Sequence, residues 1–260
     1  MNVPEMRRRM LGGEVMIGFG VRLARSTEIA SVARACGFDW LFVDMEHSAI
    51  SIDLATQICV AANDAGLVSI VRPPGKDPTI CSRLLDNGAG GLLVPHVDGP
   101  EEIQPIVDAC KFMPIGRRSY GGALPQLDYE ILPQPEHMRL ANERSMIMPM
   151  IESPKAVANA EAIAAIPGVD VLSFSTNDLA IEMGIPGELG HPRIEEAYKS
   201  VIAPCKKHGK AAGVGGIAER KLLERYLPLG FTQIQIGSDM AFVTGGARDR
   251  RAMLREIVGR

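Results

Sequence analysis

The sequence predicts a single-domain α/β protein that folds as an eight-stranded (β/α) barrel, the TIM barrel, over residues 1–260. Its length of 260 residues is close to the roughly 250 residues typical of this fold. Apolar runs recur eight times along the chain, and amphipathic helical patterns lie between them. The alternative is an open doubly wound sheet, but no G-x-G-x-x-G follows the first apolar run.

The predicted strands are short apolar runs, and several are nearly continuous rather than alternating. Strands buried on both faces of a parallel sheet have this composition. In chain order the runs are VMIGFG (15–20), WLFVD (40–44), LVSIVR (67–72), GGLLVP (90–95), MIMPMIE (146–152), DVLSFS (170–175), KAAGVG (210–215) and TQIQIG (232–237).

Helix signals separate these runs. Asp77-Pro78 and Ser153-Pro154 each combine an N-cap residue with proline at the first helical position. Residues 194–205 carry apolar side chains with the i, i+3, i+4, i+7 spacing of an amphipathic helix. One predicted helix has an apolar face that stops before Gly37 and consists of Ile29, Val32, Ala33 and Cys36.

One connection, residues 113–144, is too long for a simple turn. It contains GRRSYGG and two prolines within LPQP. Long ordered loops in compact domains usually serve a function. We therefore predict a lid or an interface here.

Composition restricts the partners. The net charge is −3, and the densest basic cluster, MRRRM at 6–10, is interpreted as a solvated helix face. A chain with one Trp and no alternation of basic and aromatic residues gives little reason to expect nucleic-acid binding. The cysteines follow no C-x-x-C pattern and mostly fall on apolar faces, which predicts buried thiols in a reducing compartment. Without a long apolar stretch or a signal peptide, a soluble cytoplasmic protein is expected, with no membrane partner.

Polar residues at the C-terminal ends of barrel strands are the catalytic candidates. Glu152 stands at the end of the fifth predicted strand and Asp178 follows the sixth, with no Cys or His at ligand spacing. Two carboxylates in this setting suit a hard divalent cation such as Mg²⁺ or Mn²⁺. The alternatives are that Glu152 pairs with Arg72 and that Asp178 caps a helix beginning at Leu179.

The second and third strands supply a possible base and a possible cation. His47 lies three residues after Asp44, and a carboxylate that holds one imidazole nitrogen leaves the other free to act as a base. Arg72 is expected to point into the barrel mouth, where it would stabilise a carboxylate or an enolate oxygen. The alternatives are a hydrogen-bonded loop histidine and an ion pair of Arg72 with Glu46 or Glu152.

Together these groups suit proton abstraction or C–C cleavage next to a carbonyl, through a metal-bound enolate. Backbone N–H groups at the start of the helix near Asp178 would cradle a carboxylate. No lysine stands at a strand end, because Lys76 and Lys155 lie beyond the strands. This disfavours a Schiff-base route.

The sequence resembles the HpcH/HpaI aldolase family, the metal-dependent (class II) pyruvate aldolases of 2-keto-3-deoxy and 4-hydroxy-2-oxo acids. The resemblance spans nearly the whole chain and is carried, in order, by VDMEHS, VRPPGKD, LLVPHV, GRRSYG, MIES, NDLAIEMG, GHPRI and GSD. It implies a phosphoenolpyruvate/pyruvate-type barrel, a divalent metal (Mg²⁺ or Mn²⁺, possibly Co²⁺) and a homohexamer with exchanged C-terminal helices. The implied substrates are a 2-oxo acid and an aldehyde.

The resemblance also implies roles for individual residues. Glu152 and Asp178 match the metal-binding carboxylates. His47, held by Asp44, matches the acid–base residue, and Arg72 matches the arginine that stabilises the pyruvate enolate. Arg118 and Gly121 match a loop near the substrate.

One segment departs from the family pattern. The family usually has an I-G-P-x-D-L-type sequence before the metal aspartate, whereas this chain has FSTNDL at 174–179, which is similar to the corresponding segment of phosphoenolpyruvate-utilising phosphotransferases. Met45 and VGG at 214–216 also differ from commoner choices. The change is expected to reshape the carboxylate cradle or the aldehyde pocket, with Ser175 and Asn177 among the substrate-binding residues.

The predicted reaction is cleavage of a 4-hydroxy-2-oxo acid to pyruvate and an aldehyde. Two rivals remain. One is another reaction of the same superfamily, such as a thioester-dependent lyase or a phosphoenolpyruvate-linked transfer. No phosphate-accepting histidine motif occurs, which argues against the transfer. The other is a non-catalytic barrel that binds a metabolite.

Overall fold

The computed structural model describes residues 1–259 and contains a closed barrel of eight parallel strands. Each strand pairs with its neighbours in chain order, and β8 closes the barrel against β1. Each strand begins and ends within one residue of its predicted run, so the predicted barrel is confirmed. The strands are β1 (Met16–Val21), β2 (Trp40–Asp44), β3 (Val68–Arg72), β4 (Gly91–Val94), β5 (Met146–Ile151), β6 (Val171–Ser175), β7 (Ala211–Gly215) and β8 (Gln233–Ser238).

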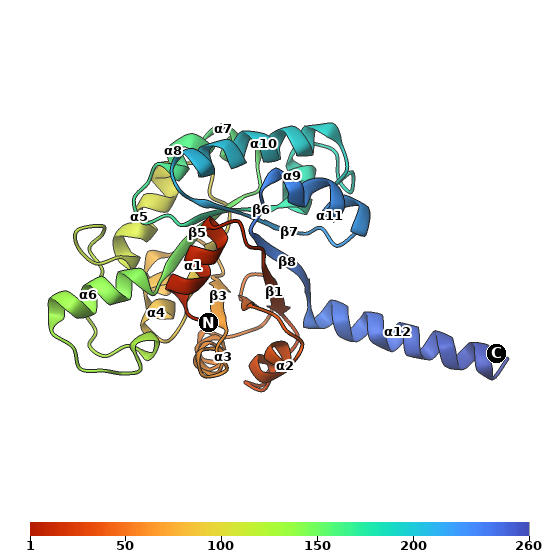
Figure 1. Cartoon of the computed structure of the whole chain (residues 1–260), viewed down its shortest axis with the longest axis horizontal. Coiled ribbons are helices and arrows are strands. Elements are labelled where there is room, and N and C mark those ends of the chain that lie inside the picture. The colour runs from red at the N-terminus through yellow and green to blue at the C-terminus, as the bar shows by residue number, and fades with distance from the viewer. Residues whose placement is uncertain (260) are drawn as a thin grey trace.

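Helices surround the barrel, except for the last one, which projects away from it (Figure 1). The helices are α1 (Val3–Leu11), α2 (Ile29–Ala35), α3 (Ile52–Asp64), α4 (Pro78–Asp86), α5 (Pro100–Cys110), α6 (Gln134–Glu143), α7 (Pro154–Ala158), α8 (Ala160–Ala164), α9 (Thr176–Glu182), α10 (Pro192–Lys207), α11 (Arg220–Tyr226) and α12 (Asp239–Ile257), with short 3₁₀ turns η1 (Pro125–Leu127) and η2 (Leu227–Leu229). In the part of the chain described, no helix has the length and apolarity needed to cross a membrane.

The strands carry an apolar interior that ends in polar side chains. Because alternate residues of a strand point to the same side, Trp40, Phe42 and Asp44 share the inner face of β2. Trp40 and Phe42 pack with Met150 of β5 inside the barrel, and Glu152 follows at the same alternation. The barrel therefore has an apolar floor and a polar C-terminal mouth.

Helix α1 belongs to this inner core. Val3, Met6 and Met10 are buried and join the same apolar cluster as Trp40. Arg7, within the basic cluster, donates from Nε to Asp170 at 2.9 Å. The predicted solvated face is therefore only part of the role of this cluster, because Arg7 also attaches α1 to the barrel.

The 113–144 segment lies on the outside of the barrel. Leu124 and Leu127 pack with Phe112 in a separate small core. Gln126 donates from Nε2 to the carbonyl of Ala89, just before β4, at 2.8 Å. This contact lies near the N-terminal end of β4, which is the end opposite the mouth.

Two local predictions are corrected. Cys36 is exposed, whereas the other four cysteines are buried as predicted. Cys36 caps the C-terminal end of α2 and is turned away from the barrel. Val32, within α2, also faces outward and is 49% exposed. Helix α9 begins at Thr176 rather than Leu179, so Asp178 lies in its first turn and does not cap it.

Candidate active site

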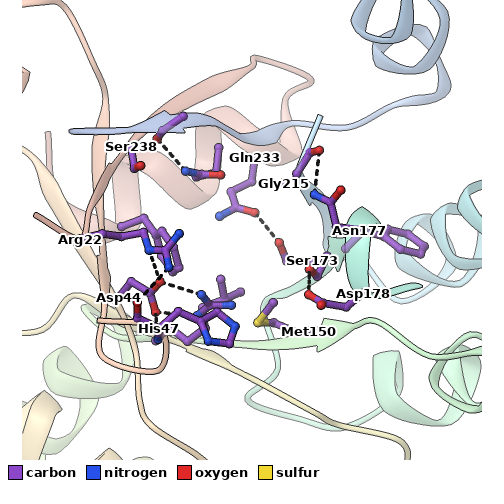
Figure 2. Close-up of a pocket in the computed structure, with 18 of the residues that line it drawn as sticks. Arg22, Asp44, His47, Met150, Ser173, Asn177, Asp178, Gly215, Gln233 and Ser238 are labelled. Atoms are coloured by element: carbon purple, nitrogen blue, oxygen red, sulfur yellow. Dashed lines mark hydrogen bonds and ion pairs between the residues drawn. The ribbon is translucent and has the colours of Figure 1, made fainter. Parts of the chain in front are cut away.

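A cavity of about 350 Å³ opens at the C-terminal ends of the strands (Figure 2). Its floor is formed by Trp40, Phe42, Leu93 and Met150, and its walls carry most of the predicted site residues. These are Asp44, His47, Arg72, Ser175, Asn177 and Asp178.

Asp44 is the centre of a charged cluster at the ends of β2 and β3. The register places it directly opposite Arg72. Its two carboxylate oxygens accept from Nε and Nη2 of Arg72 at 2.9 and 2.8 Å. Although burial disfavours its charged form, the hydrogen bonds and charge of Arg72 hold the pKa of Asp44 below its usual value. Asp44 therefore remains ionised and fixes the guanidinium.

The predicted contact between Asp44 and the His47 imidazole is wrong. Asp44 Oδ1 accepts from the backbone N–H of His47 at 3.2 Å, so it holds the turn rather than the ring. The carboxylate near the ring is Glu46, whose Oε2 is 3.7 Å from His47 Nε2. The His47 side chain is 53% exposed and lines the cavity.

Arg72 pairs with Glu46, one of the two partners expected for it. Its Nη1 lies 3.1 Å from Glu46 Oε2, so all three of its nitrogens contact carboxylates. A guanidinium has five N–H groups, and three contacts leave hydrogens available for a ligand. No pair between Arg72 and Glu152 forms within residues 1–259.

Glu152 faces an adjoining cavity of about 310 Å³, whose lining it shares with Asp178 and His96. Its Oε1 accepts from the backbone N–H of His96 and lies 3.1 Å from His96 Nδ1. Burial raises the pKa of Glu152 despite the hydrogen bond from His96, and the negative charges of Asp178 and Glu46 raise it further. This clustering of negative charge is a feature that a bound cation would relieve.

Asp178 lies where the two cavities meet, because it lines both. The hydroxyl of Ser175 donates to its Oδ2. Asn177, in the same first turn of α9, donates from Nδ2 to the carbonyl of Gly216 at 3.1 Å. The segment that departs from the family pattern is thus tied to the loop after β7.

Arg118 lies elsewhere. Its Nη2 donates to Asp86 at 2.7 Å, and its side chain is only 1% exposed. Its guanidinium also stacks over Phe112, 5.1 Å from the ring centre. Neither Arg118 nor Gly121 lines the cavity in this chain.

Sequence reasoning missed two residues. His96 follows β4, and its Nε2 is 2.8 Å from Glu46, so its ring lies between Glu46 and Glu152. Arg22 follows β1 and lines the main cavity. Both stand just beyond strand ends, and the strand-end rule that identified Arg72 would have found them.

Comparison with known proteins places the chain in a family. The model of the HpcH/HpaI aldolase/citrate lyase family matches residues 22–244. The chain belongs to this family. The recognition made from motifs is therefore confirmed, and so is the predicted enzyme class, since the relatives are named as aldolases.

Two curated relatives and one solved structure illustrate the similarity. A 4-hydroxy-4-methyl-2-oxoglutarate aldolase of Hapsidospora irregularis is 35% identical over 82% of this chain and 80% of its own length. A hydroxypyruvate/pyruvate aldolase of Pseudomonas aeruginosa is 33% identical over 99% and 92%. The HpcH/HpaI aldolase crystal structure from Desulfitobacterium hafniense superposes with a TM-score of 0.90 at 27% identity, covering 96% of both chains.

Proposed function

We propose that the protein is a class II aldolase that cleaves 4-hydroxy-2-oxo acids to pyruvate and an aldehyde, and catalyses the reverse addition. The observation that carries this proposal is that Arg72, His47 and Asp178 line one cavity at the barrel mouth. The names of the relatives, a 4-hydroxy-4-methyl-2-oxoglutarate aldolase and a hydroxypyruvate/pyruvate aldolase, agree with that substrate class.

A divalent cation, Mg²⁺ or Mn²⁺ with Co²⁺ as a further candidate, is part of the proposal. Glu152 and Asp178 would hold it. Within residues 1–259 no group of three His, Cys, Asp or Glu side chains is placed to hold a metal ion, so water and substrate oxygens would complete the shell, as Mg²⁺ tolerates. The buried Glu152 carboxylate, whose pKa its acidic neighbours raise, fits such a cation. When bound, the cation would polarise the 2-oxo group of the substrate.

The protein groups have distinct roles in this proposal. Arg72, fixed by Asp44 and Glu46, donates N–H groups to the oxygen that gains charge as the enolate forms. His47 accepts the proton of the C4 hydroxyl, directly or through water, while the C3–C4 bond breaks and the aldehyde leaves. Protonation of the enolate at C3 then gives pyruvate.

Ser175 and Asn177 are proposed to shape the side of the cavity that receives the substrate carboxylate. Both line the cavity at the start of α9. Ser175 donates to Asp178, and Asn177 holds the loop at Gly216. Their expected contribution is to orient Asp178 and the backbone N–H groups next to it.

A homo-oligomer, with the family's hexamer as the expected form, is also proposed. Helix α12 extends away from the barrel (Figure 1) and carries exposed apolar side chains that include Val243, Leu254 and Ile257. The 113–144 segment adds Tyr129 and Ile131, which are 60% and 98% exposed. Exposed apolar groups of this kind often mark subunit contacts.

A reducing, cytoplasmic location is also proposed. The four buried thiols support it.

The direct test is release of pyruvate from 4-hydroxy-2-oxo acids, coupled to a pyruvate-reducing dehydrogenase, with Mg²⁺, Mn²⁺ or EDTA. We expect cleavage with either metal and its loss on thorough chelation. Undiminished cleavage after chelation would contradict the metal-dependent mechanism. No cleavage of any substrate with metal present would favour a barrel that only binds metabolites. Cleavage of thioesters alone would favour a thioester-dependent lyase of the same superfamily.

A further inference from the structure

Arg22 occupies a fixed position at the rim of the cavity. It is the first residue after β1, and the carboxylate of Asp239 at the start of α12 accepts from three successive backbone N–H groups. These belong to Arg22, Leu23 and Ala24, at 2.9, 2.9 and 2.7 Å. Asp239 is only 4% exposed. Asp239, at the start of the last helix, therefore holds the backbone that carries Arg22.

The guanidinium of Arg22 is less committed than that of Arg72. Its Nε lies 3.2 Å from Asp44 Oδ2, and its Nη2 donates to the carbonyl of His47 at 2.9 Å. Its Nη1 has no protein partner within residues 1–259. The side chain is 43% exposed, against 9% for Arg72. Arg22 therefore presents N–H groups to the cavity without needing to break a buried ion pair.

Arg22 also lies across the mouth from the proposed cation site. In a closed barrel of eight strands, β1 and β5 are four strands apart in either direction, and Glu152 follows β5. Figure 2 shows Arg22 and Asp178 on opposite sides of the cavity. A 2-oxo acid held at Asp178 would thus extend its far end towards Arg22.

The remaining lining leaves Arg22 as the less engaged of two cations. Arg22 and Arg72 are the only Lys or Arg side chains among the described lining residues. Arg72 contacts two carboxylates, Asp44 and Glu46, whereas Arg22 contacts Asp44 alone. The floor is uncharged, because its apolar side chains are joined only by the neutral Ser173 and Gln233, and Gln235, near the β1 side, is also uncharged. A second substrate carboxylate would find its charge partner in Arg22.

We propose that Arg22 binds the distal carboxylate of the substrate, so that the enzyme favours 4-hydroxy-2-oxo dicarboxylates over the corresponding monocarboxylates. In the direction of synthesis, the preferred acceptor is an aldehyde or 2-oxo compound that carries its own carboxylate. The planar guanidinium, with several N–H donors on one side, matches a carboxylate. This inference rests on the proposed aldolase function.

The test compares wild type with Arg22→Gln and Arg22→Lys on dicarboxylates and monocarboxylates of five to seven carbons in the same coupled assay. Losing a charge-assisted hydrogen bond should lower kcat/KM for the dicarboxylate by about tenfold to a hundredfold, mainly through KM. The monocarboxylate should change little. The Lys variant should restore part of the preference because it keeps the charge but not the planar fork.

Arg25→Gln is the matched control. It removes the same charge from the same loop, but Arg25 donates only to carbonyls of that loop and does not line the cavity. Its ratio of dicarboxylate to monocarboxylate activity should equal that of wild type. Equal losses on both substrate types in Arg22→Gln would instead make Arg22 a positioning residue for Asp44 and His47, and would overturn the proposal.

A binding measurement separates this inference from the aldolase proposal. Calorimetry with 2-oxoglutarate and 2-oxopentanoate, which lack the C4 hydroxyl and are not cleaved, should show tighter binding of the dicarboxylate that Arg22→Gln removes. If that preference appears without any cleavage activity, the aldolase proposal fails and the role of Arg22 stands. If cleavage occurs but neither assay shows a preference that depends on Arg22, the inference about Arg22 fails alone.

Discussion

At the scale of single residues, the cluster at the ends of β2 and β3 organises the site. Asp44 is fully buried and contacts Arg72, Arg22 and the turn at His47. Removing one member of a buried ion pair leaves the other charge without compensation. Asp44 therefore contributes to stability as well as to the geometry around Arg72.

The variant Asp44→Asn should lower the free energy of unfolding by about 3–5 kcal/mol, measured by urea denaturation at neutral pH. Asp128→Asn, at a side chain that is 88% exposed, is the control and should be nearly neutral. Because the pKa of Asp44 is lowered in the fold from its ordinary 3.8, its contribution is present above that value. It is lost as the pH falls through the folded-state pKa. The gap between wild type and Asp44→Asn should therefore shrink in acid, and a gap independent of pH would contradict this account.

Which residues form the site was more predictable than which partners they choose. Asp44, Arg72, Glu152 and Asp178 were identified because the strand-end rule depends only on local sequence. The pairing of Asp44 with Arg72 depends on the register between β2 and β3, which no pattern within either strand specifies. The contact between Asp44 and the His47 ring was wrongly predicted for that reason.

At the scale of elements, the strands were predicted within one residue because each is an apolar run bounded by turn residues. Alternation along β2 also explains the cavity floor. Trp40 lies below Asp44 on the same face, and a neighbouring glycine on β1, Gly18, makes room for its ring. A Cβ built on Gly18 would lie 2.3 Å from the Trp40 ring.

Gly18→Ala should therefore push Trp40 towards the cavity and destabilise the protein by about 1–3 kcal/mol, the usual range for overpacking a core. Thermal unfolding followed by Trp fluorescence reports both effects, since the chain has one Trp. Gly75→Ala is the control because a Cβ there meets nothing within 4 Å. An unchanged melting temperature and emission spectrum in Gly18→Ala would argue against this packing role.

At the scale of the whole molecule, the barrel followed from eight repeats, whereas the direction of α12 did not. The sequence of α12 indicates a helix with some apolar side chains, but it does not specify the surface against which those side chains pack. In the described chain, α12 contacts β1 and β8 near its start, and its distal residues Met253, Leu254 and Ile257 are exposed.

The double variant Leu254→Glu, Ile257→Glu should dissociate the proposed oligomer because it places charges in an apolar contact. Sedimentation velocity would then show a smaller species, while the barrel itself stays folded. Arg251→Ala, also exposed on α12, should leave the assembly intact. A wild-type protein that sediments as a monomer would contradict the proposal.

We propose that catalysis depends on a divalent cation held by Glu152 and Asp178 at the barrel mouth. The most direct measurement is Mn²⁺ binding by electron paramagnetic resonance, together with pyruvate release, in wild type, Glu152→Gln and the control Glu182→Gln. Glu182 lines the same cavity as Glu152 but is exposed. Glu152→Gln should bind Mn²⁺ at least about tenfold more weakly and lose pyruvate release, while Glu182→Gln stays close to wild type. Wild-type Mn²⁺ affinity in Glu152→Gln would contradict the account.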